Sequence, residues 1–271
     1  MRKNPTNSNR SKRSVAQESK EKQSSSYKQG WKVKPSQIER TSLNNLRVLY
    51  EDNHIIAVNK RPSDIVQADH TKDTVLSSIV STYLAKKHNK PGEAFIAIIH
   101  RIDRPVSGVI VYAKTSKAAK RLTAMFKNRE IQKTYWAIVE NAPPKAEDVV
   151  QNYLKKNGTR NKSYVHKEAI EGAKKSELSY KFVGSGTKYH FMEVYPKTGR
   201  HHQIRTTLSN IGCAIKGDVK YMAKRTNNDA SVCLHARKIE FIHPVKKEPI
   251  SITAPPPENN LWAEFIRLTN N

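Results

Sequence analysis

The stretch His100-Arg101-Ile102-Asp103-Arg104-Pro105-Val106-Ser107-Gly108-Val109 places one carboxylate between two arginines and then enters an apolar run that ends at Ala113. The apolar run is typical of a buried strand. This arrangement favours a catalytic role for the carboxylate, because a nearby guanidinium lowers the carboxyl pKa and keeps the group ionised. An ionised carboxylate can attack an electrophilic carbon. From this segment alone, a structural Asp–Arg pair at a strand end is the alternative interpretation of Asp103.

Hydrophobic periodicity outside this stretch predicts an α+β domain on a mainly antiparallel mixed sheet. Ala142-Pro143-Pro144 divides a half that contains helices from a half that is mostly β. The expected strands cover 46–50, 54–58, 94–99, 107–113, 131–139, about 147–155, 163–168, 176–183, 188–195, 232–241 and 249–253, and the strand over 94–99 is expected to be buried. One helix is expected to begin at Thr74, with Asp73 or Thr74 as its N-cap. Three further helices are expected over 118–126, 200–210 and 261–268.

The charge of the chain indicates a polyanionic partner. The formal net charge is +25, from 49 Lys and Arg, against 24 Asp and Glu. Residues 1–40 hold 11 Lys and Arg and 3 Glu, which leaves +17 for the remainder. Such an excess attracts nucleic acid and repels itself unless a partner offsets it. A generally basic composition that only serves solubility is the alternative.

Residues 1–40 are rich in Ser, Asn, Lys, Arg and Gln and contain few aliphatic side chains. This composition predicts a disordered basic N-terminal tail, which either extends a nucleic-acid contact or has no role, ahead of one folded domain over 41–271. No apolar run reaches the ~20 residues that span a bilayer, and no apolar segment follows the basic N-terminus as in a signal peptide. We therefore expect a cytoplasmic protein without membrane contact, and a monomer as the simplest state.

Several familiar kinds of chemistry are excluded by missing motifs. Cys213 and Cys233 are too few for a four-ligand zinc site, and no CxxC pair exists. The sequence also lacks a phosphate loop, a dinucleotide fingerprint, a deaminase signature and a nucleophile elbow. Adjacent His201 and His202 do not have the spacing of a zinc helix. We expect no metal and no cofactor.

Two further segments carry polar or aromatic side chains that suit a nucleic acid. The segment from Thr198 to Arg205 predicts a basic helix N-terminus for phosphate or nucleotide contacts, with a solvated helix face as the alternative. Around Tyr135, strand alternation places Lys133 on the same face and Trp136 on the opposite one. Tyr135 could stack on a base or act as an acid or base, and simple packing is the alternative.

Taken together and in this order, five segments resemble the RluA-type family of RNA pseudouridine synthases. The segment His100–Val109 looks like the catalytic motif of that family. The others resemble its KxY segment (Gln132–Val139), its TGRTHQIR segment (Lys197–Arg205), its GDxxY stretch (Ile215–Tyr221) and its late LHA (Leu234-His235-Ala236). The resemblance covers about residues 46–269.

The resemblance implies the pseudouridine synthase fold and an enzyme that isomerises uridines in ribosomal or transfer RNA without metal or cofactor. It implies Asp103 as the nucleophile, Arg205 as the partner that keeps it ionised, and Tyr135 against the flipped base and as the base at C2′. Arg101 would fill the gap left by the extruded uridine. The other side chains expected to contact RNA are His100, Arg104, Lys133, Arg200, His202 and Gln203.

Three features depart from the family pattern. The early NKPxG loop reads Asn59-Lys60-Arg61-Pro62-Ser63-Asp64, His201 stands where threonine is common, and residues 1–40 replace an S4-like domain. Two other functions stay open at this point. One is a catalytically idle RNA-binding or ribosome-assembly factor on the same fold, and the other is a nucleic-acid hydrolase that uses Asp103, His100 and a divalent ion.

Overall fold

The computed structural model describes residues 38–68 and 73–269 of the chain. The predicted tail over 1–40 therefore lies almost wholly outside the described residues. Its last three residues are described, and two of them contact the domain through ion pairs. Glu39 Oε1 lies 2.8 Å from Arg61 Nη2, and Arg40 Nη1 lies 2.8 Å from Asp73 Oδ1.

The predicted α+β class is confirmed, because the described chain forms one mixed sheet with a few helices. The strands are β1 (Val48–Glu51), β2 (Ile55–Lys60), β3 (Ala97–Ile98), β4 (Ser107–Ala113), β5 (Gln132–Val139), β6 (Glu147–Asn157), β7 (Lys162–His166), β8 (Lys174–Ser185), β9 (His190–Pro196), β10 (Leu234–Ile242) and β11 (Pro249–Thr253). The helices are α2 (Leu76–Lys87), α3 (Ser116–Asn128), α4 (Gln203–Asn210), the 3₁₀ turn η3 (Val219–Tyr221) and α5 (Asn260–Thr269).

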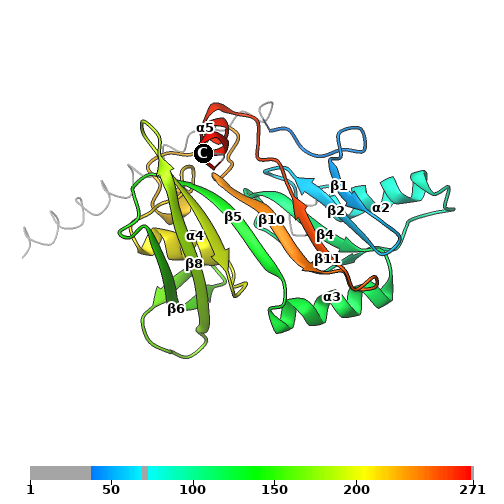
Figure 1. Ribbon diagram of the computed structural model, residues 1–271, viewed down its shortest axis with the longest axis horizontal. Helices are drawn as coiled ribbons and strands as arrows, with labels where there is room; N and C mark the ends of the chain where they lie inside the picture. The colour runs from blue at the N-terminus through cyan, green and yellow to red at the C-terminus, as the bar shows by residue number, and fades with distance from the viewer. Residues whose placement is uncertain (1–37, 69–72, 270–271) are drawn as a thin grey trace, which may run out of the picture. The chain divides into compact units, whose positions relative to one another are not determined.

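The sheet has the order β1-β2-β4-β10-β5-β9-β8-β6-β7, with β11 added to β10 and β3 to β4. Figure 1 shows β5 and β10 through its middle, with β2 and β4 to one side and β6 and β8 to the other. Among the strands of the described chain, only β4 and β10 pair in parallel. The sheet thus joins two antiparallel halves at the β4–β10 contact.

That contact depends on Gly108. Its φ is +121°, and a Cβ added there would lie 2.3 Å from the backbone oxygen of Ala236 on β10. Only glycine lets two backbones approach so closely. Because β4 starts at Ser107, this close contact lies directly after the segment that carries Asp103.

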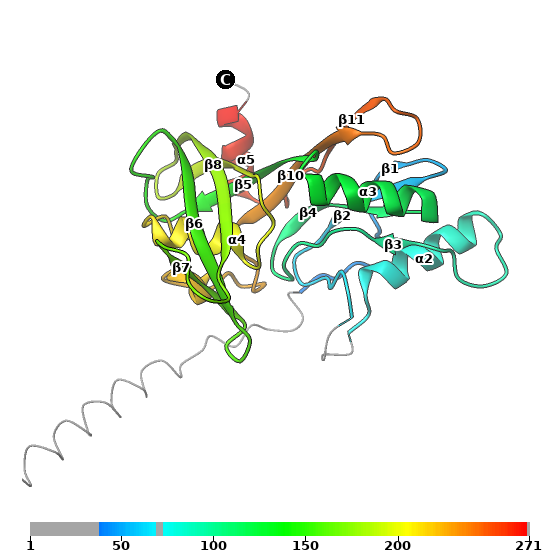
Figure 2. The ribbon, with the colours of Figure 1, turned by 90° about the horizontal axis from the view of Figure 1, so that it is seen from below.

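The apolar runs of the sequence become the centre of the core. Every residue of β2 and of β4 is buried, as continuous apolar strands covered on both faces require. Thr115 caps α3, since its side chain accepts a hydrogen bond from Ala118 N. Helix α3 packs on β4, α4 against β7 and α5 against β8 (Figures 1 and 2). No helix of the described segments has the length and apolarity needed to cross a bilayer.

The predicted buried strand over 94–99 is wrong. Only Ala97–Ile98 form a strand, and Phe95 and Ile98 are 53% and 39% exposed. The start of β4 pairs with β10, and the Val111 amide is taken by the His100 ring, so β3 pairs with Tyr112 and Ala113 at the far end of β4. The segment before His100 is therefore a short ladder followed by a loop.

Two predicted helix starts also differ. Helix α2 begins after Val75 without a side-chain cap, because the proposed cap Asp73 pairs with Arg40 and Arg104 instead. Helix α4 begins at Gln203 rather than at 200, since His202 before it adopts a left-handed conformation with φ 52°. Gly212, with φ +86°, follows the end of α4, as the sequence predicted.

Candidate active site

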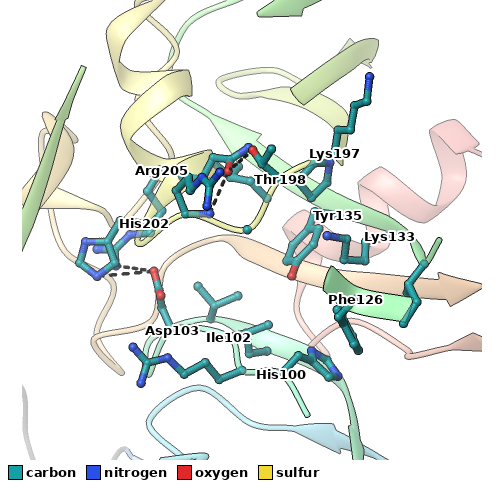
Figure 3. Close-up of a pocket in the computed structure, with 18 of the residues that line it drawn as sticks. His100, Ile102, Asp103, Phe126, Lys133, Tyr135, Lys197, Thr198, His202 and Arg205 are labelled. Carbon is teal, nitrogen blue, oxygen red and sulfur yellow. Dashed lines mark hydrogen bonds and ion pairs between the residues drawn. The ribbon is translucent and has the colours of Figure 1, made fainter. Parts of the chain in front are cut away.

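A pocket of about 620 Å³ lies where the β3–β4 loop, β5 and the start of α4 meet. Its size is that of a small-molecule or nucleotide site. In Figure 3, Asp103 and His202 lie on one side of the pocket, and Tyr135 and Lys133 lie on the other. Of the predicted site residues, Arg104 alone lies outside the lining of this pocket. Those that line it are His100, Arg101, Asp103, Lys133, Tyr135, Arg200, His202, Gln203 and Arg205.

Asp103 is held by Arg205, which is itself held by Asp218. The guanidinium Nη1 donates to Asp103 Oδ2 at 2.9 Å, while Nε and Nη2 donate to the two carboxylate oxygens of Asp218 at 2.6 and 2.8 Å. Arg205 and Asp218 are buried, whereas the Asp103 side chain is 28% exposed towards the pocket. The two-point pair with Asp218 fixes the guanidinium plane, so Arg205 meets Asp103 in a set orientation.

Asp103 stays ionised at neutral pH. Burial acts to raise its pKa, but the positive charge of its surroundings, that of Arg205 included, outweighs burial, and the net shift is downward. Burial lowers the pKa of His202 to about 3, so this imidazole is neutral. The lasting charge beside Asp103 is therefore that of Arg205.

The neutral ring of His202 is oriented by Tyr221. The Tyr221 hydroxyl accepts from the backbone amide of Ser163 at 2.8 Å and lies 2.9 Å from His202 Nδ1. The other ring nitrogen, Nε2, lies 3.7 Å from Asp103 Oδ2. Tyr221 also lies under the guanidinium of Arg205, 5.2 Å from ring centroid to Cζ. One tyrosine thus positions both neighbours of Asp103.

The loop that carries Asp103 is tied to the sheet by Lys60. Its buried ammonium donates to the backbone oxygens of Arg61, Arg104 and Val106 at 2.8, 3.0 and 2.7 Å. Burial lowers the pKa of this amine to about 7. The departure from the NKPxG pattern lies here, and the buried Asp64 accepts from the backbone amides of Thr41 and Arg61. The altered loop therefore keeps the lysine and adds a carboxylate of its own.

The β5 side chains alternate as the sequence predicted. Lys133 and Tyr135 line the pocket, and Trp136 points to the other face, where its Nε1 donates to Glu193 Oε1 at 2.9 Å. Burial, with a smaller contribution from Asp103, raises the pKa of Tyr135. The phenol is therefore neutral at physiological pH. Burial also lowers the pKa of Lys133.

His100 lies inside the pocket rather than on its rim. Its ring stacks on Phe126 with centroids 4.8 Å apart, and its Nε2 accepts from the Val111 amide at 3.0 Å. Burial lowers its pKa to about 3. This neutral ring is bonded to the middle of β4 and presents an aromatic surface to the pocket (Figure 3).

The remaining predicted contacts differ in exposure. Arg101 is exposed, and its Nη1 lies 3.5 Å from Gln67 Oε1. Arg104 pairs with Asp73 at 2.6 Å, and Arg200 Nε donates to Lys175 O at 2.9 Å. Gln203 is buried, and its amide bonds Thr198, the Arg200 backbone and the Glu177 backbone. The structure thus places Gln203 as a support for the Arg200 loop.

The sequence assigned no role to Asp218, Lys60 or Tyr221, although all three contact the Asp103 environment. Asp218 and Tyr221 lie in the Gly217–Tyr221 stretch, and that motif was the signal that could have found them. Lys60 stands in the segment that resembles the NKPxG loop, but its role could not be predicted, because its acceptors are backbone oxygens. Within residues 38–68 and 73–269, no three His, Cys, Asp or Glu side chains are grouped to hold a metal ion.

Comparison with known proteins identifies the family to which the sequence is related. The profile of the family described as RNA pseudouridylate synthase matches residues 54–210. Ribosomal large subunit pseudouridine synthase C of Buchnera aphidicola subsp. Baizongia pistaciae is 30% identical over 78% of this chain and 67% of its own length. The tRNA pseudouridine synthase C of Vibrio cholerae is 30% identical over 77% of this chain and 90% of its own length.

The fold is shared with solved structures. Human RNA pseudouridylate synthase domain containing 4 superimposes with a TM-score of 0.67 at 20% identity, over 83% of this chain and 93% of that chain. Human RNA pseudouridylate synthase domain containing 1 gives 0.63 at 20% identity, over 86% and 98%. The family profile covers more than half of the chain, and the chain belongs to the RNA pseudouridylate synthase family.

Proposed function

We propose that this protein isomerises specific uridines of ribosomal or transfer RNA to pseudouridine, with Asp103 as the nucleophile. The observation that carries the proposal is the ion pair of 2.9 Å between Arg205 and an Asp103 carboxylate that still opens into the pocket. Relatives that match this chain are named for ribosomal and for transfer RNA. Either RNA is a candidate substrate here.

In the proposed reaction, Asp103 bonds to C1′ of the ribose as the N-glycosidic bond breaks. Arg205 keeps the carboxylate ionised until it attacks, because a guanidinium favours the charged form of a carboxyl. The released base turns in the pocket, and its C5 displaces the carboxylate from C1′. The hydrogen of C5 leaves as a proton, and N1, which lost its bond to the ribose, takes up a proton. The product has the same atoms as the substrate, so no cofactor is required.

Tyr135 lies against the flipped base in this proposal. Its phenol is held neutral by burial, so it accepts a proton from C2′ only if it passes its own proton to a neighbour. Stacking on the base needs no such transfer. Arg101, exposed beside Asp103, enters the gap that the uridine leaves in the RNA. Extrusion of a base costs a few kcal/mol, least in loops and bulges.

The RNA backbone is bound through the basic surface. His100, Lys133 and His202 contact the base or ribose inside the pocket, while Arg104, Arg200 and their neighbours contact phosphates, and Gln203 acts by holding the Arg200 loop. We place the protein in the cytoplasm, as a monomer, where its RNA is made and assembled.

The test is tritium release from cellular RNA labelled at C5 of uridine, with wild type and Asp103→Asn compared. Formation of the C5–C1′ bond expels that tritium, so wild type is expected to release it. Asp103→Asn is expected to lower release by at least about 1,000-fold, the scale seen when a key group of an active site is removed. Its fold and RNA affinity should stay intact, because Arg205 keeps the Asp218 pair.

Two other outcomes have definite meanings. Binding of RNA that survives Asp103→Asn, with no release from wild type, would identify an idle RNA-binding or assembly factor. Cleavage of RNA that EDTA abolishes would identify the hydrolase. Either result would overturn the proposed isomerase.

A further inference from the structure

Lys133 is a cation in the pocket without a counter-ion. Its side chain is half-buried on β5, and within the described residues no carboxylate or hydrogen-bond acceptor meets its ammonium. A buried charge without a partner is costly, and proteins retain such groups mainly at functional sites. Lys133 is therefore a group whose partner arrives with the substrate.

The neighbouring cations differ from it. The guanidinium of Arg205 is already paired with two carboxylates, and Lys197 at the pocket rim pairs with Glu177 at 2.7 Å. Lys197 is also 59% exposed, so water screens its charge. Lys133 lies instead beside the neutral phenol of Tyr135, opposite Asp103 (Figure 3).

Resting on the function proposed above, we propose that Lys133 is a catalytic residue that binds a carbonyl oxygen of the target uracil and stabilises the negative charge on the released base. When the C1′–N1 bond breaks, its electron pair stays on uracil and spreads from N1 to O2 and O4. An ammonium offers three donors and no acceptor, which suits a carbonyl oxygen that gains charge. Capture of C1′ by C5 then uses that electron pair and returns the base to neutrality, after which C5 loses its proton and N1 gains one.

This arrangement puts the two charged partners of the reaction on opposite walls of one pocket. Asp103 gives up its negative charge when it bonds to C1′, and at that moment the base acquires one. The cation at Lys133 then interacts more strongly with the intermediate than with the neutral uridine. Such a difference accelerates the reaction, since only interactions stronger after bond breaking lower the barrier.

The experiment measures single-turnover rates with saturating enzyme on a short RNA around the uridine mapped by tritium release. The target position carries either uridine or 5-fluorouridine, and conversion is followed by nucleoside digestion and chromatography. Lys133→Met is expected to slow uridine conversion by about 100-fold, the scale of one lost charge-stabilising donor, with RNA affinity within about threefold. On 5-fluorouridine the loss should fall below about tenfold, because fluorine itself stabilises the uracil anion.

The controls separate charge from folding. Lys133→Arg should recover part of the rate, and Lys117→Met, the same change on the exposed start of α3, should leave the rate unchanged. The melting temperature of Lys133→Met should equal or exceed that of wild type, because the fold loses a half-buried unpaired charge.

Four results would overturn the proposal and leave the isomerase function in place. The first is equal loss on uridine and 5-fluorouridine, and the second is a loss in RNA affinity alone. The third is unfolding of Lys133→Met, which would make the lysine structural, and the fourth is activity of Lys133→Met equal to wild type. A wild type that converts no uridine would overturn the proposed function, and this inference with it.

Discussion

At the scale of single residues, the charge of Asp103 is set by its surroundings in a way that predicts the pH dependence. A carboxyl whose pKa is lowered stays ionised at every pH above that lowered pKa. The reaction rate should therefore fall, on the acid side, only at a pH below 3.8, the ordinary pKa of an aspartate. Burial lowers the pKa values of His100 and His202 to about 3, so neither imidazole titrates near 6.5.

We therefore expect the single-turnover rate of tritium release to stay constant as the pH falls from about 7 to about 5, where an ordinary imidazole would become charged. The measurement is the rate at saturating enzyme across this range, with circular dichroism to check the fold. A limb with an apparent pKa near 6.5 that persists in Lys60→Met would mean that a histidine of the site changes charge during function.

Lys60 gives a second prediction at this scale. Lys60→Met removes the donor to three backbone oxygens, and each buried acceptor left without a partner costs about 1–3 kcal/mol. Urea unfolding should show a loss of about 2–5 kcal/mol, and tritium release should fall because the Asp103 loop is no longer tied down. Unchanged stability would show that water or another donor replaces the ammonium.

The same lysine makes the stability of the wild type depend on pH. Its pKa is about 7 in the fold, against an ordinary lysine value of 10.5, so between these values the unfolded chain binds the extra proton. Stability then rises with pH across this window. The difference in unfolding free energy between wild type and Lys60→Met should follow that rise.

At the scale of elements, the β4–β10 contact is where the two halves of the sheet meet. Gly108→Ala should disrupt it, because the new Cβ would lie 2.3 Å from Ala236 O and at φ +121°. We expect a stability loss of at least about 3 kcal/mol in urea unfolding, together with loss of activity. Gly92→Ala is the matched control, since Gly92 has φ +107° but no atom within 4 Å of the added Cβ. Equal losses in both variants would mean that backbone strain, and not the close contact, matters.

The elements also show what a sequence can and cannot predict. Strands β2 and β4 were predictable because each is a continuous apolar run, and α5 because its stripe is strongly periodic. The edge pairing of β3 and the late start of α4 depend on distant partners, namely the route of β10 and the bonds of Gln203. Periodicity within a window carries no information about such partners.

The site follows the same division. Asp103, Tyr135 and Arg205 were predicted as a set because each stands in a recognisable motif, and the structure brings all three to one pocket. The roles of the other groups depend on contacts that only the fold reveals. Gln203 was expected to touch RNA, yet its amide is used within the protein, and the backbone bonds of Lys60 leave no trace in residue type.

At the scale of the whole molecule, the net charge of +25 predicts binding that weakens steeply with salt. Removal of residues 1–37 should leave the melting temperature unchanged and reduce both RNA affinity and the slope of its salt dependence. Removal through Thr41 should also lower the melting temperature, because Thr41 bonds the buried Asp64 at 2.9 and 2.6 Å. Filter binding at several salt concentrations and thermal melts of the two truncations test this. Equal melting temperatures would mean that Thr41 does not stabilise the domain.

The chain of contacts from Asp218 through Arg205 to Asp103 has a consequence for the covalent intermediate that the proposed function includes. A guanidinium with Asp103 as its sole counter-ion would be left with an uncompensated charge once that carboxylate became an ester. Here Asp218 remains bound to Arg205 by two hydrogen bonds throughout. Ester formation removes the negative charge of Asp103, and the remaining pair of Asp218 and Arg205 has no net charge. The reaction can therefore proceed in either direction without repacking of the protein interior, and the same pair is ready to receive the carboxylate when product forms.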